Sequence, residues 1–168
     1  MPDFIILTIP VKKKIALIAH DNKKQDLVDW CARNQEILIR HELCGTGTTA
    51  MLITGMTGMT VKGYNSGPLG GDQQIGAKIV EGKVDLVIFF SDPLTAQPHD
   101  PDVKALMRIA QVYDIPIATN RATADFLITS PLMNATYDRK VVNFRRAVSR
   151  RSQEMANMAD REPAEKRN

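Results

Sequence analysis

Residues 65–77 read Asn-Ser-Gly-Pro-Leu-Gly-Gly-Asp-Gln-Gln-Ile-Gly-Ala, and the rest of the chain is organised around this stretch. A run typical of a β-strand, Val61–Tyr64, precedes it, and a run typical of a helix, about 73–81, follows it. Three glycines and a proline lie between Ser66 and Asp72, where the backbone must turn tightly or approach another group closely. Asp72 stands at the expected helix start, where an aspartate either caps the helix or faces a site. The stretch predicts a strand, a tight turn and a helix, with an acid at their junction.

The same unit of strand and helix recurs along the chain. Short apolar runs typical of buried strands occur at residues 14–19, 42–44, 61–64, 86–90 and 116–118. Helices are expected at residues 49–57, 73–81, 100–113, 123–130 and 144–158, and one helix or two at 23–40. This alternation predicts the α/β class, as a single-domain, doubly wound, parallel five-stranded sheet with helices on both faces. We expect an N-terminal extension at 1–13, the domain at 14–150 and a basic C-terminal tail at 151–168.

The composition is that of a soluble globular protein, with 43% hydrophobic and 24% charged residues. The longest apolar run, Leu86–Phe90, is too short to cross a membrane. No basic segment followed by a long apolar run opens the chain, so we expect a cytoplasmic protein without a membrane partner. Cys31 and Cys44 have neither metal-ligand spacing nor a disulfide framework, and we expect both to be buried thiols.

The net charge of +3 is unevenly distributed. Residues 139–151 contain six lysines and arginines and no acid, a pattern that can contact nucleic acid. Few aromatic side chains accompany these cations, and several acids follow from Glu154 onward. We therefore expect a solvated or subunit-contacting tail and no nucleic-acid partner.

The segments that follow the strands are the candidates for a site, because ligands of open parallel sheets bind outside the carboxyl ends of the strands. These segments are small, polar or ionisable, and we expect all of them on one edge: His20–Asp21, Gly45–Thr49, Asn65–Gly67, Ser91–Asp92 and Thr119–Asn120. Ordinary solvated turns are the alternative interpretation.

Gly45-Thr46-Gly47-Thr48-Thr49 is a candidate phosphate cradle between a strand and a helix. The first N–H groups of a helix lack intrahelical partners, the helix dipole favours an anion, and the three hydroxyls can donate hydrogen bonds. The segment is not a P-loop, because the spacing and terminal lysine of that motif are missing. Lys24 can supply a counter-charge to the same phosphate. When each residue is taken alone, the threonines are explained equally well as helix caps, and Lys24 is explained equally well as a surface lysine.

Four aspartates accompany this cradle: Asp21, Asp72, Asp92 and Asp102. Such a group either binds Mg²⁺ or raises the proton affinity of one member by repulsion between like charges. In the second case, crowding by Asp21 and Asp92 makes Asp72 a stronger base. His99 precedes a helix start, which favours a neutral imidazole that can donate to a carbonyl or enolate oxygen. An ordinary loop histidine is the alternative. Together these groups suit proton abstraction beside the carbonyl of a small phosphorylated ketose.

At this point the sequence resembles the methylglyoxal synthase family, over roughly residues 14–130. The specific segments are Gly-Gly-Asp-Gln-Gln at 70–74 and Pro-His-Asp-Pro-Asp-Val-Lys-Ala-Leu at 98–106. Further matches are Ile18–Asp21 with Lys24, the segments 45–49, 66–69, 75–76, 89–94, 118–120 and 122–125, and Ser130-Pro131. The tail after Pro131 matches poorly and is longer and more basic.

The resemblance implies conversion of dihydroxyacetone phosphate to methylglyoxal and inorganic phosphate, with no metal or organic cofactor. It implies that Asp72 removes the proton, that His99 binds the substrate oxygens and shuttles a proton, and that Asp102 supports His99. It implies that the phosphate is held by Lys24, Thr46, Gly47, Thr48, Thr49, Ser66 and Gly67. His20, Asp21 and Asp92 would line the site and set the base. The family implies a homohexamer inhibited by phosphate, in which an arginine near the C-terminus, Arg151 or Arg150, reaches a neighbouring subunit.

Several rival functions remain open on the residues alone. A non-catalytic effector-binding domain, similar to the regulatory end of carbamoyl phosphate synthetase, could keep the cradle but has no need of both Asp72 and His99. A receiver-type signalling domain requires paired acids after the first strand, where His20–Asp21 offers one. A divalent-metal hydrolase would lose its activity on treatment with EDTA. An isomerase would protonate the enediolate where the synthase expels phosphate.

Overall fold

Strand β2 (Lys14–Ala19) is the centre of a five-stranded sheet in the computed structural model, which describes residues 3–159 apart from the side chain of residue 147. The strand order is β4-β3-β2-β5-β6, and every neighbouring pair is parallel. The other strands are β3 (Glu42–Gly45), β4 (Val61–Gly63), β5 (Leu86–Phe90) and β6 (Ile117–Ala118). The predicted α/β class and parallel sheet are confirmed.

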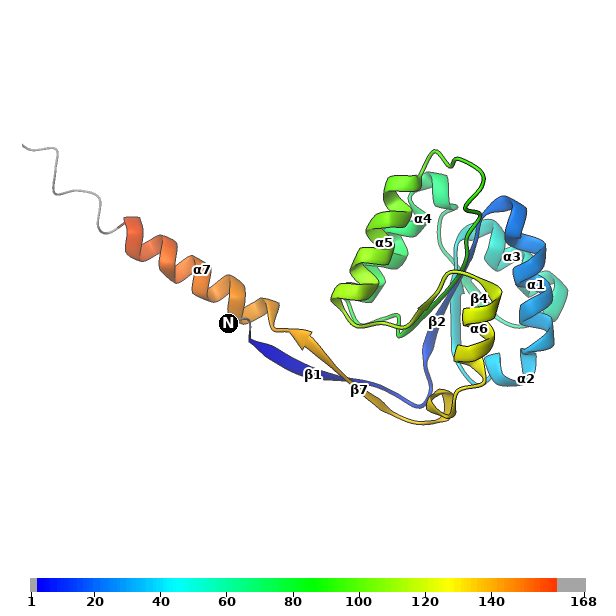
Figure 1. Ribbon diagram of the computed structural model, residues 1–168, viewed down its shortest axis with the longest axis horizontal. Coiled ribbons are helices and arrows are strands. Elements are labelled where there is room, and N and C mark those ends of the chain that lie inside the picture. Colours follow the sequence, from blue (N-terminus) through cyan, green and yellow to red (C-terminus); the bar gives the residue numbers. More distant parts are fainter. Residues whose placement is uncertain (1–2, 160–168) are drawn as a thin grey trace, which may run out of the picture.

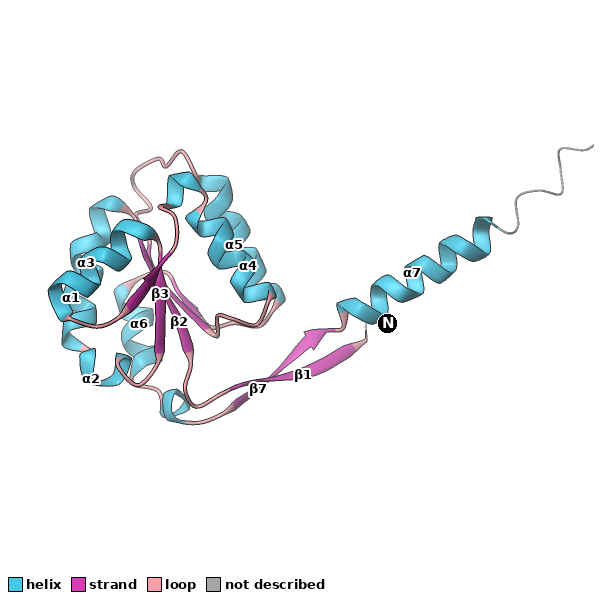
Figure 2. Ribbon diagram, turned by 180° about the vertical axis from the view of Figure 1, so that it is seen from behind, coloured by secondary structure: helices cyan, strands magenta, loops and turns pink. Residues whose placement is uncertain are grey.

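The helices form two layers, one on each face of the sheet (Figures 1 and 2). One face is covered by α1 (Lys24–Arg33), α2 (Gln35–Leu38), α3 (Gly47–Thr57) and α6 (Arg121–Ile128). The other face is covered by α4 (Gly71–Val80) and α5 (Asp100–Val112). The region 23–40, expected to hold one helix or two, holds two, which meet at Asn34.

Strand residues alternate between these two layers because successive side chains of a strand point to opposite faces. In β2, Ile15 and Leu17 pack in the core beneath α1 and α3, whereas Ala16 and Ile18 pack in the core beneath α4 and α5. Full burial of each such isoleucine or leucine contributes about 1.5–3 kcal/mol. Both faces of β5 are covered in the same way, which explains its uninterrupted apolar sequence.

The chain reverses its direction across the sheet between β2 and β5. From β2 it proceeds to β3 and β4 on one side, and then returns to place β5 and β6 on the other. A crevice opens at the carboxyl ends of strands where the order reverses in this way. His20 directly follows β2 and Ser91 directly follows β5, so both lie at this point.

An arm extends from the body of the molecule (Figure 1). It is an antiparallel pair of β1 (Phe4–Ile9) with β7 (Tyr137–Val142), continued by α7 (Phe144–Ala159). The helix was predicted, but neither strand was, because their partners lie more than a hundred residues apart along the chain. Helix α7 runs through residue 150, where we placed the boundary between domain and tail. Residues 160–168 of the expected tail lie outside the described residues.

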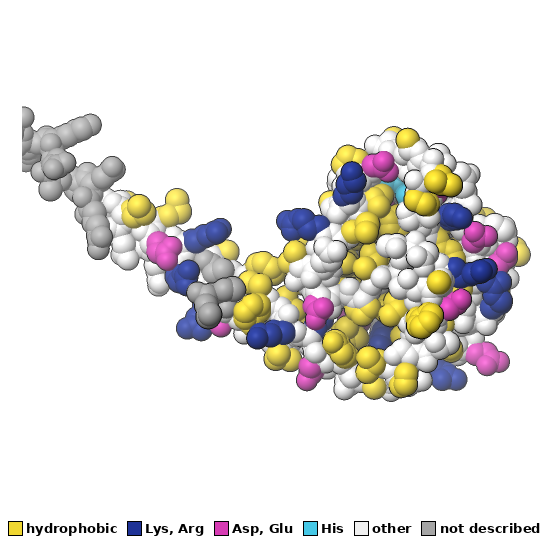
Figure 3. Space-filling model, viewed as in Figure 1, with side chains coloured by type: hydrophobic (Ala, Val, Ile, Leu, Met, Phe, Trp, Pro, Cys, Tyr) yellow, Lys and Arg dark blue, Asp and Glu magenta, His cyan; other side chains and the backbone are white. Residues whose placement is uncertain are grey.

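Buried polar contacts hold the base of the arm. The ammonium group of Lys13 donates to the backbone oxygens of Pro10 and Ala135, and the guanidinium group of Arg139 donates to the backbone oxygen of Tyr113. Further out, apolar side chains such as Phe4, Ile6 and Val148 are exposed, and yellow patches are visible along the arm in Figure 3. A two-stranded ribbon has little stability alone, so these contacts fix the direction in which the arm leaves. None of the described helices is long and apolar enough to cross a membrane.

Candidate active site

A polar cavity of about 240 Å³ lies at the carboxyl ends of β2, β3 and β4. Its walls contain ten of the thirteen residues expected to bind or transform a substrate: His20, Asp21, Lys24, Thr46, Thr48, Thr49, Ser66, Gly67, Asp72 and His99. The walls also contain Ile18, Ala19, Pro68 and Gln97, which sequence reasoning missed. Gln97 could have been found, since it lies two residues before His99 in the same loop.

The turn after β4 delivers Asp72 into this cavity. A short 3₁₀ turn, Gly67–Leu69, leads to Gly70, which adopts a φ of 93° that favours glycine. A Cβ atom on Gly71 would lie 2.0 Å from the backbone oxygen of Asn65, so only glycine fits there. Asp72 therefore enters α4 at its second residue, with its side chain 1% exposed.

Asp72 and His99 form the core of the site. The Nε2 atom of His99 lies 3.4 Å from Oδ2 of Asp72, and both side chains are buried. Burial raises the pKa of Asp72, the nearby His99 lowers it and the nearby Asp102 raises it. Neither carboxylate oxygen of Asp72, nor Nδ1 of His99, has a hydrogen-bond partner among the described residues. Buried polar atoms are normally satisfied, so these atoms are suited to meet a ligand.

His20 adds a donor to the same cavity. Its Nδ1 accepts a hydrogen bond from the backbone N–H of Asp92 at 2.9 Å, so the hydrogen of the neutral ring is on Nε2. Burial is the main cause that lowers the pKa of His20, and His99 lowers it further. The rings of His20 and His99 meet edge to face with their centroids 5.5 Å apart. At neutral pH the cavity thus holds an uncharged imidazole with a buried Nε2 that lacks a partner among the described residues.

The predicted phosphate cradle lines the same cavity as Asp72 and His99. Thr46 precedes the first turn of α3, and the buried hydroxyl of Thr49 has no hydrogen-bond partner among the described residues. The N–H groups of the first turn of a helix are available to an anion. Lys24 supplies a cation and pairs with the exposed carboxylate of Asp21. These donors can hold a small dianion.

Two glycines shape the cradle without supplying side chains. Gly47 lies outside the cavity wall, and a Cβ atom there would lie 2.8 Å from the backbone oxygen of Tyr64. Gly67 lies in the wall, and a Cβ atom there would lie 2.8 Å from Nε2 of His99 and 3.3 Å from Oδ2 of Asp72. Glycine at 67 therefore leaves room beside the carboxylate and the imidazole.

The expectation that Asp21 and Asp92 crowd Asp72 is wrong. The Asp21 side chain is 90% exposed and paired with Lys24, which lowers the pKa of Asp21. Asp92 lies outside the cavity wall, where hydrogen bonds from Asn22, Thr95 and Leu94 hold its pKa at about 2. The pKa of Asp72 is raised instead by burial, with Asp102 as the like-charged neighbour.

The remaining predicted residues lie outside this cavity. Asp102 is one turn into α5, and its Oδ1 accepts a hydrogen bond from Nε2 of Gln73 at 2.9 Å. Arg150 and Arg151 are exposed on α7, in the arm that extends away from the body (Figure 1). Within this chain, the structure does not bring either arginine to the cavity.

We expected the polar segments that follow the five strands to lie together, but they line two separate cavities. The segments after β2, β3 and β4 line the small cavity, whereas Ser91, Thr119 and Asn120, after β5 and β6, line a second cavity. Among the described residues, no group of three or more histidine, cysteine or carboxylate side chains is arranged to hold a metal ion.

The arrangement combines a base, a proton-transfer group and an anion cradle. A carboxylate with a raised pKa can accept a proton from a weakly acidic carbon. A neutral imidazole in hydrogen-bonding reach can stabilise charge that develops on a neighbouring oxygen. A substrate anchored by its anionic end would present its carbonyl region to both groups.

Comparison with known proteins agrees with this interpretation. A family model described as the MGS-like domain matches residues 26–119. A methylglyoxal synthase from Clostridium acetobutylicum is 62% identical over 133 residues, which cover 79% of this chain and 92% of that protein. One from Leptospira interrogans is 56% identical over 144 residues, which cover 86% of this chain and 97% of that protein.

A solved structure shows the same fold. The crystal structure of methylglyoxal synthase from Elizabethkingia anophelis matches with a TM-score of 0.79 and 48% identity, over 83% of this chain and 92% of that one. The family model spans more than half of this chain, and the relatives are matched along nearly their whole length. The resemblance noted in the sequence is confirmed: this chain belongs to the methylglyoxal synthase family.

Proposed function

We propose that this protein is a carbon–oxygen lyase acting on phosphates, which converts dihydroxyacetone phosphate to methylglyoxal and inorganic phosphate without a metal or organic cofactor. The observation that carries the proposal is the buried Asp72, whose carboxylate has a raised pKa and lies 3.4 Å from the imidazole of His99. The same cavity contains a set of anion donors, and the curated relatives are named methylglyoxal synthases.

The cradle, Asp72 and His99 each have a separate role in the reaction. The first-turn N–H groups of α3, with Lys24, Thr48 and Thr49, hold the phosphate. Asp72 takes a proton from the hydroxymethyl carbon, and the electron pair of the C–H bond moves toward the carbonyl, giving an enediolate. His99 donates a hydrogen bond to the oxygen on which negative charge develops.

Elimination completes the reaction. The C–O bond to phosphate breaks and its electron pair leaves with the phosphate, while the double bond of the enediolate shifts to the methylene carbon. The remaining hydroxyl becomes the aldehyde, its proton passes to the departing phosphate, and the enolate of methylglyoxal remains. That enolate takes up a proton at its methylene carbon and becomes methylglyoxal, and Asp72 gives up the proton that it accepted in the first step. Asp102 acts at a distance, because its negative charge raises the proton affinity of Asp72.

Four functional alternatives are less well supported. An effector-binding regulatory domain has no use for a buried carboxylate beside an imidazole, and the relatives are named as enzymes. A metal hydrolase or a receiver domain would need acids that lie together. Here Asp21 forms an ion pair with Lys24, and Asp92 accepts a hydrogen bond from Asn22. An isomerase would use the same first step but would hold the C–O bond to phosphate within the enediolate plane.

The assembly and regulation of the enzyme are also part of the proposal. We infer a cytoplasmic homohexamer that inorganic phosphate inhibits allosterically. The exposed apolar side chains of the arm, such as Ile6 and Val148, support contact with a second copy. In that assembly Arg151, or its neighbour Arg150, would reach the cavity of an adjacent subunit.

The deciding experiment is to incubate the purified protein with dihydroxyacetone phosphate and to measure methylglyoxal and inorganic phosphate over time. We expect equimolar release of both products, at the same rate with and without EDTA, and a blank without protein corrects for spontaneous decomposition. Formation of glyceraldehyde 3-phosphate without phosphate release would indicate an isomerase. Loss of activity with EDTA would indicate a metal enzyme, and absence of any product would support a regulatory domain.

A further inference from the structure

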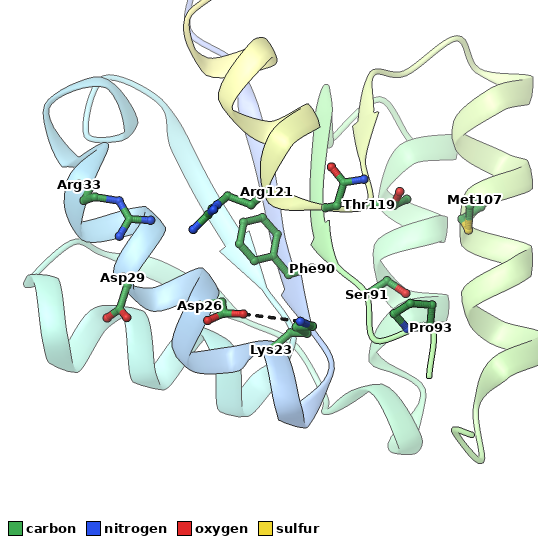
Figure 4. A pocket seen from close by; sticks show the side chains of 11 residues that line it. Lys23, Asp26, Asp29, Arg33, Phe90, Ser91, Pro93, Met107, Thr119 and Arg121 are labelled. Atoms are coloured by element: carbon green, nitrogen blue, oxygen red, sulfur yellow. Dashed lines mark ion pairs between the residues drawn. The ribbon is translucent and has the colours of Figure 1, made fainter. Parts of the chain in front are cut away.

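A second, larger cavity lies beside the proposed catalytic one, at the carboxyl ends of β5 and β6 (Figure 4). Its volume is about 780 Å³, against about 240 Å³ for the catalytic cavity. Residues of α1, α5 and α6 line it, and Phe90, at the end of β5, forms part of its wall. No residue with a role in the proposed reaction lines it. Its size lies in the range of pockets that hold small organic ligands.

Two arginines give this cavity a place for an anion. Arg33 ends α1 and Arg121 begins α6, and Figure 4 shows their guanidinium groups turned toward each other. Over residues 3–159, no carboxylate forms an ion pair with either arginine. Asp29, one turn before Arg33, accepts a hydrogen bond from Gln25 instead. Two facing cations repel each other, and the oxygens of a phosphate fit the forked donors of both.

The remaining wall suits the organic part of such a ligand. Pro93 and Met107 supply apolar surface toward the opposite end of the cavity, and the nearly buried ring of Phe90 lies near Arg121 (Figure 4). Asp26, which pairs with Lys23 at 3.7 Å, supplies an acceptor for a hydroxyl or amino group. We propose that this cavity binds an organic phosphate monoester larger than a triose phosphate, with its phosphate between Arg33 and Arg121 and a flat apolar part toward Pro93 and Met107.

Two short segments connect this cavity to the catalytic one. The 3₁₀ turn Asp21–Lys23 separates them, with Lys23 in the wall of the larger cavity and Asp21 in the wall of the smaller. Ser91 lines the larger cavity, and the next residue, Asp92, donates its N–H to His20 in the smaller. A ligand that moves either segment will change the catalytic cavity. This consequence rests on the proposed function, whereas the binding itself does not.

Adenosine 5′-monophosphate is a suitable probe, because it carries a phosphate, hydroxyls and a flat ring and is larger than a triose phosphate. Trp30, the one tryptophan of the chain, reports its binding. The Trp30 ring meets the Phe90 ring with centroids 6.0 Å apart, and its Nε1 donates to Asp125 of α6 at 2.8 Å. The dissociation constant is obtained by titrating the full-length protein and following tryptophan fluorescence.

We expect saturable binding of adenosine 5′-monophosphate and none of adenosine. Arg33→Ala and Arg121→Ala should each weaken binding about tenfold or more, because each removes a charge-assisted contact. Arg40→Ala, an exposed arginine outside the cavity, should leave binding unchanged, as should Lys24→Met in the catalytic cradle. The bound nucleotide should also change KM for dihydroxyacetone phosphate in the wild-type protein.

Three results would overturn the proposal. The first is no binding by the folded wild-type protein, which is expected if a second copy of the chain covers the cavity. The second is binding that Lys24→Met abolishes and Arg33→Ala does not, which places the nucleotide in the catalytic cavity. The third is binding that leaves both KM and kcat unchanged in an active enzyme, which removes the effector role. The fluorescence titration requires no turnover, so its failure is distinct from a failure of the proposed reaction.

Discussion

Two turns at the carboxyl edge of the sheet each carry an aspartate, and they surround it differently. The turn after β4 leaves both carboxylate oxygens of Asp72 buried and without a hydrogen-bond donor among the described residues. The loop after β5 surrounds Asp92 with donors, including Nδ2 of Asn22 and the N–H of Leu94, each at 3.0 Å. The pKa of Asp72 is raised by burial, and the pKa of Asp92 is lowered to about 2 by its hydrogen bonds.

The comparison shows what makes one of these carboxylates suited to be a base. We expected crowding by other acids to set the proton affinity of Asp72, and the larger cause is the removal of water and donors. Asp92 instead has a structural role, since it orders its own loop and its N–H orients His20. The turn after β4 therefore supplies the base, and the loop after β5 positions His20.

The largest expected effect comes from Asp72→Asn. The amide keeps the size of the carboxylate but cannot accept a proton from carbon, so kcat should fall by about 10²–10⁴-fold. Binding of inorganic phosphate, measured by calorimetry, should be nearly unchanged, because the cradle residues Lys24, Thr48 and Thr49 are left intact. A variant that forms methylglyoxal at close to the wild-type rate would show that Asp72 is not the base.

Asp92→Asn is the matched variant for this comparison. It alters the other turn, where the carboxylate faces donors and not the cavity. We expect a much smaller loss of kcat than for Asp72→Asn, because only the orientation of His20 is disturbed. Equal losses in the two variants would contradict the division between a chemical and a positioning acid.

Gly67→Ala should produce the next largest effect. The added methyl group would lie 2.8 Å from Nε2 of His99, so the imidazole must move away from Asp72. Displacement by about 1 Å can cost 10²-fold in rate, and we expect kcat to fall by at least about tenfold while the fold is retained.

Gly55→Ala provides the control for that substitution. Gly55 lies in α3, and an added Cβ atom there meets nothing within 4 Å. Alanine is the better helix former, so the control should keep full activity and gain up to about 1 kcal/mol in free energy of unfolding. Full activity of Gly67→Ala would show that the space beside His99 is not needed.

The pH dependence of kcat/KM should locate the base. Because burial raises the pKa of Asp72, the acid limb of the profile should lie above the ordinary aspartate value of 3.8. Asp102→Asn removes a like charge that raises this pKa, so the limb should move to lower pH, whatever happens to kcat. Asp92→Asn should leave the limb in place. A limb that moves to higher pH in Asp102→Asn would contradict this electrostatic account.

The sequence was sufficient for the features that depend on local pattern. Apolar runs such as Leu86–Phe90 marked the buried parallel strands, and glycines with Asp72 marked the turn that enters the cavity. The pairing of β1 with β7 could not be predicted, because Phe4 and its partner Val142 are far apart along the chain, although Phe4–Ile9 is an apolar run of strand length. Such non-local contacts follow from the whole fold.

The electrostatics of the site could be predicted only in part. Residue types and strand ends identified ten members of the cavity wall. The surroundings of Asp92 depend on Asn22, seventy residues earlier, and on the course of its own loop. The division of the edge into two cavities depends on where α1 and α6 lie, which no motif encodes.

The smallest expected effect is on stability, and it should have opposite signs in the two turns. The folded protein disfavours ionised Asp72, so at pH 7 Asp72→Asn should raise Tm, and this gain should disappear below the ordinary pKa of 3.8. The folded protein favours ionised Asp92, whose stabilisation is present above 3.8 and is lost as the pH falls through about 2. Asp92→Asn should therefore lower Tm at pH 7, as measured by calorimetry. Tm shifts of the same sign in both variants would mean that donors and burial do not distinguish the two carboxylates.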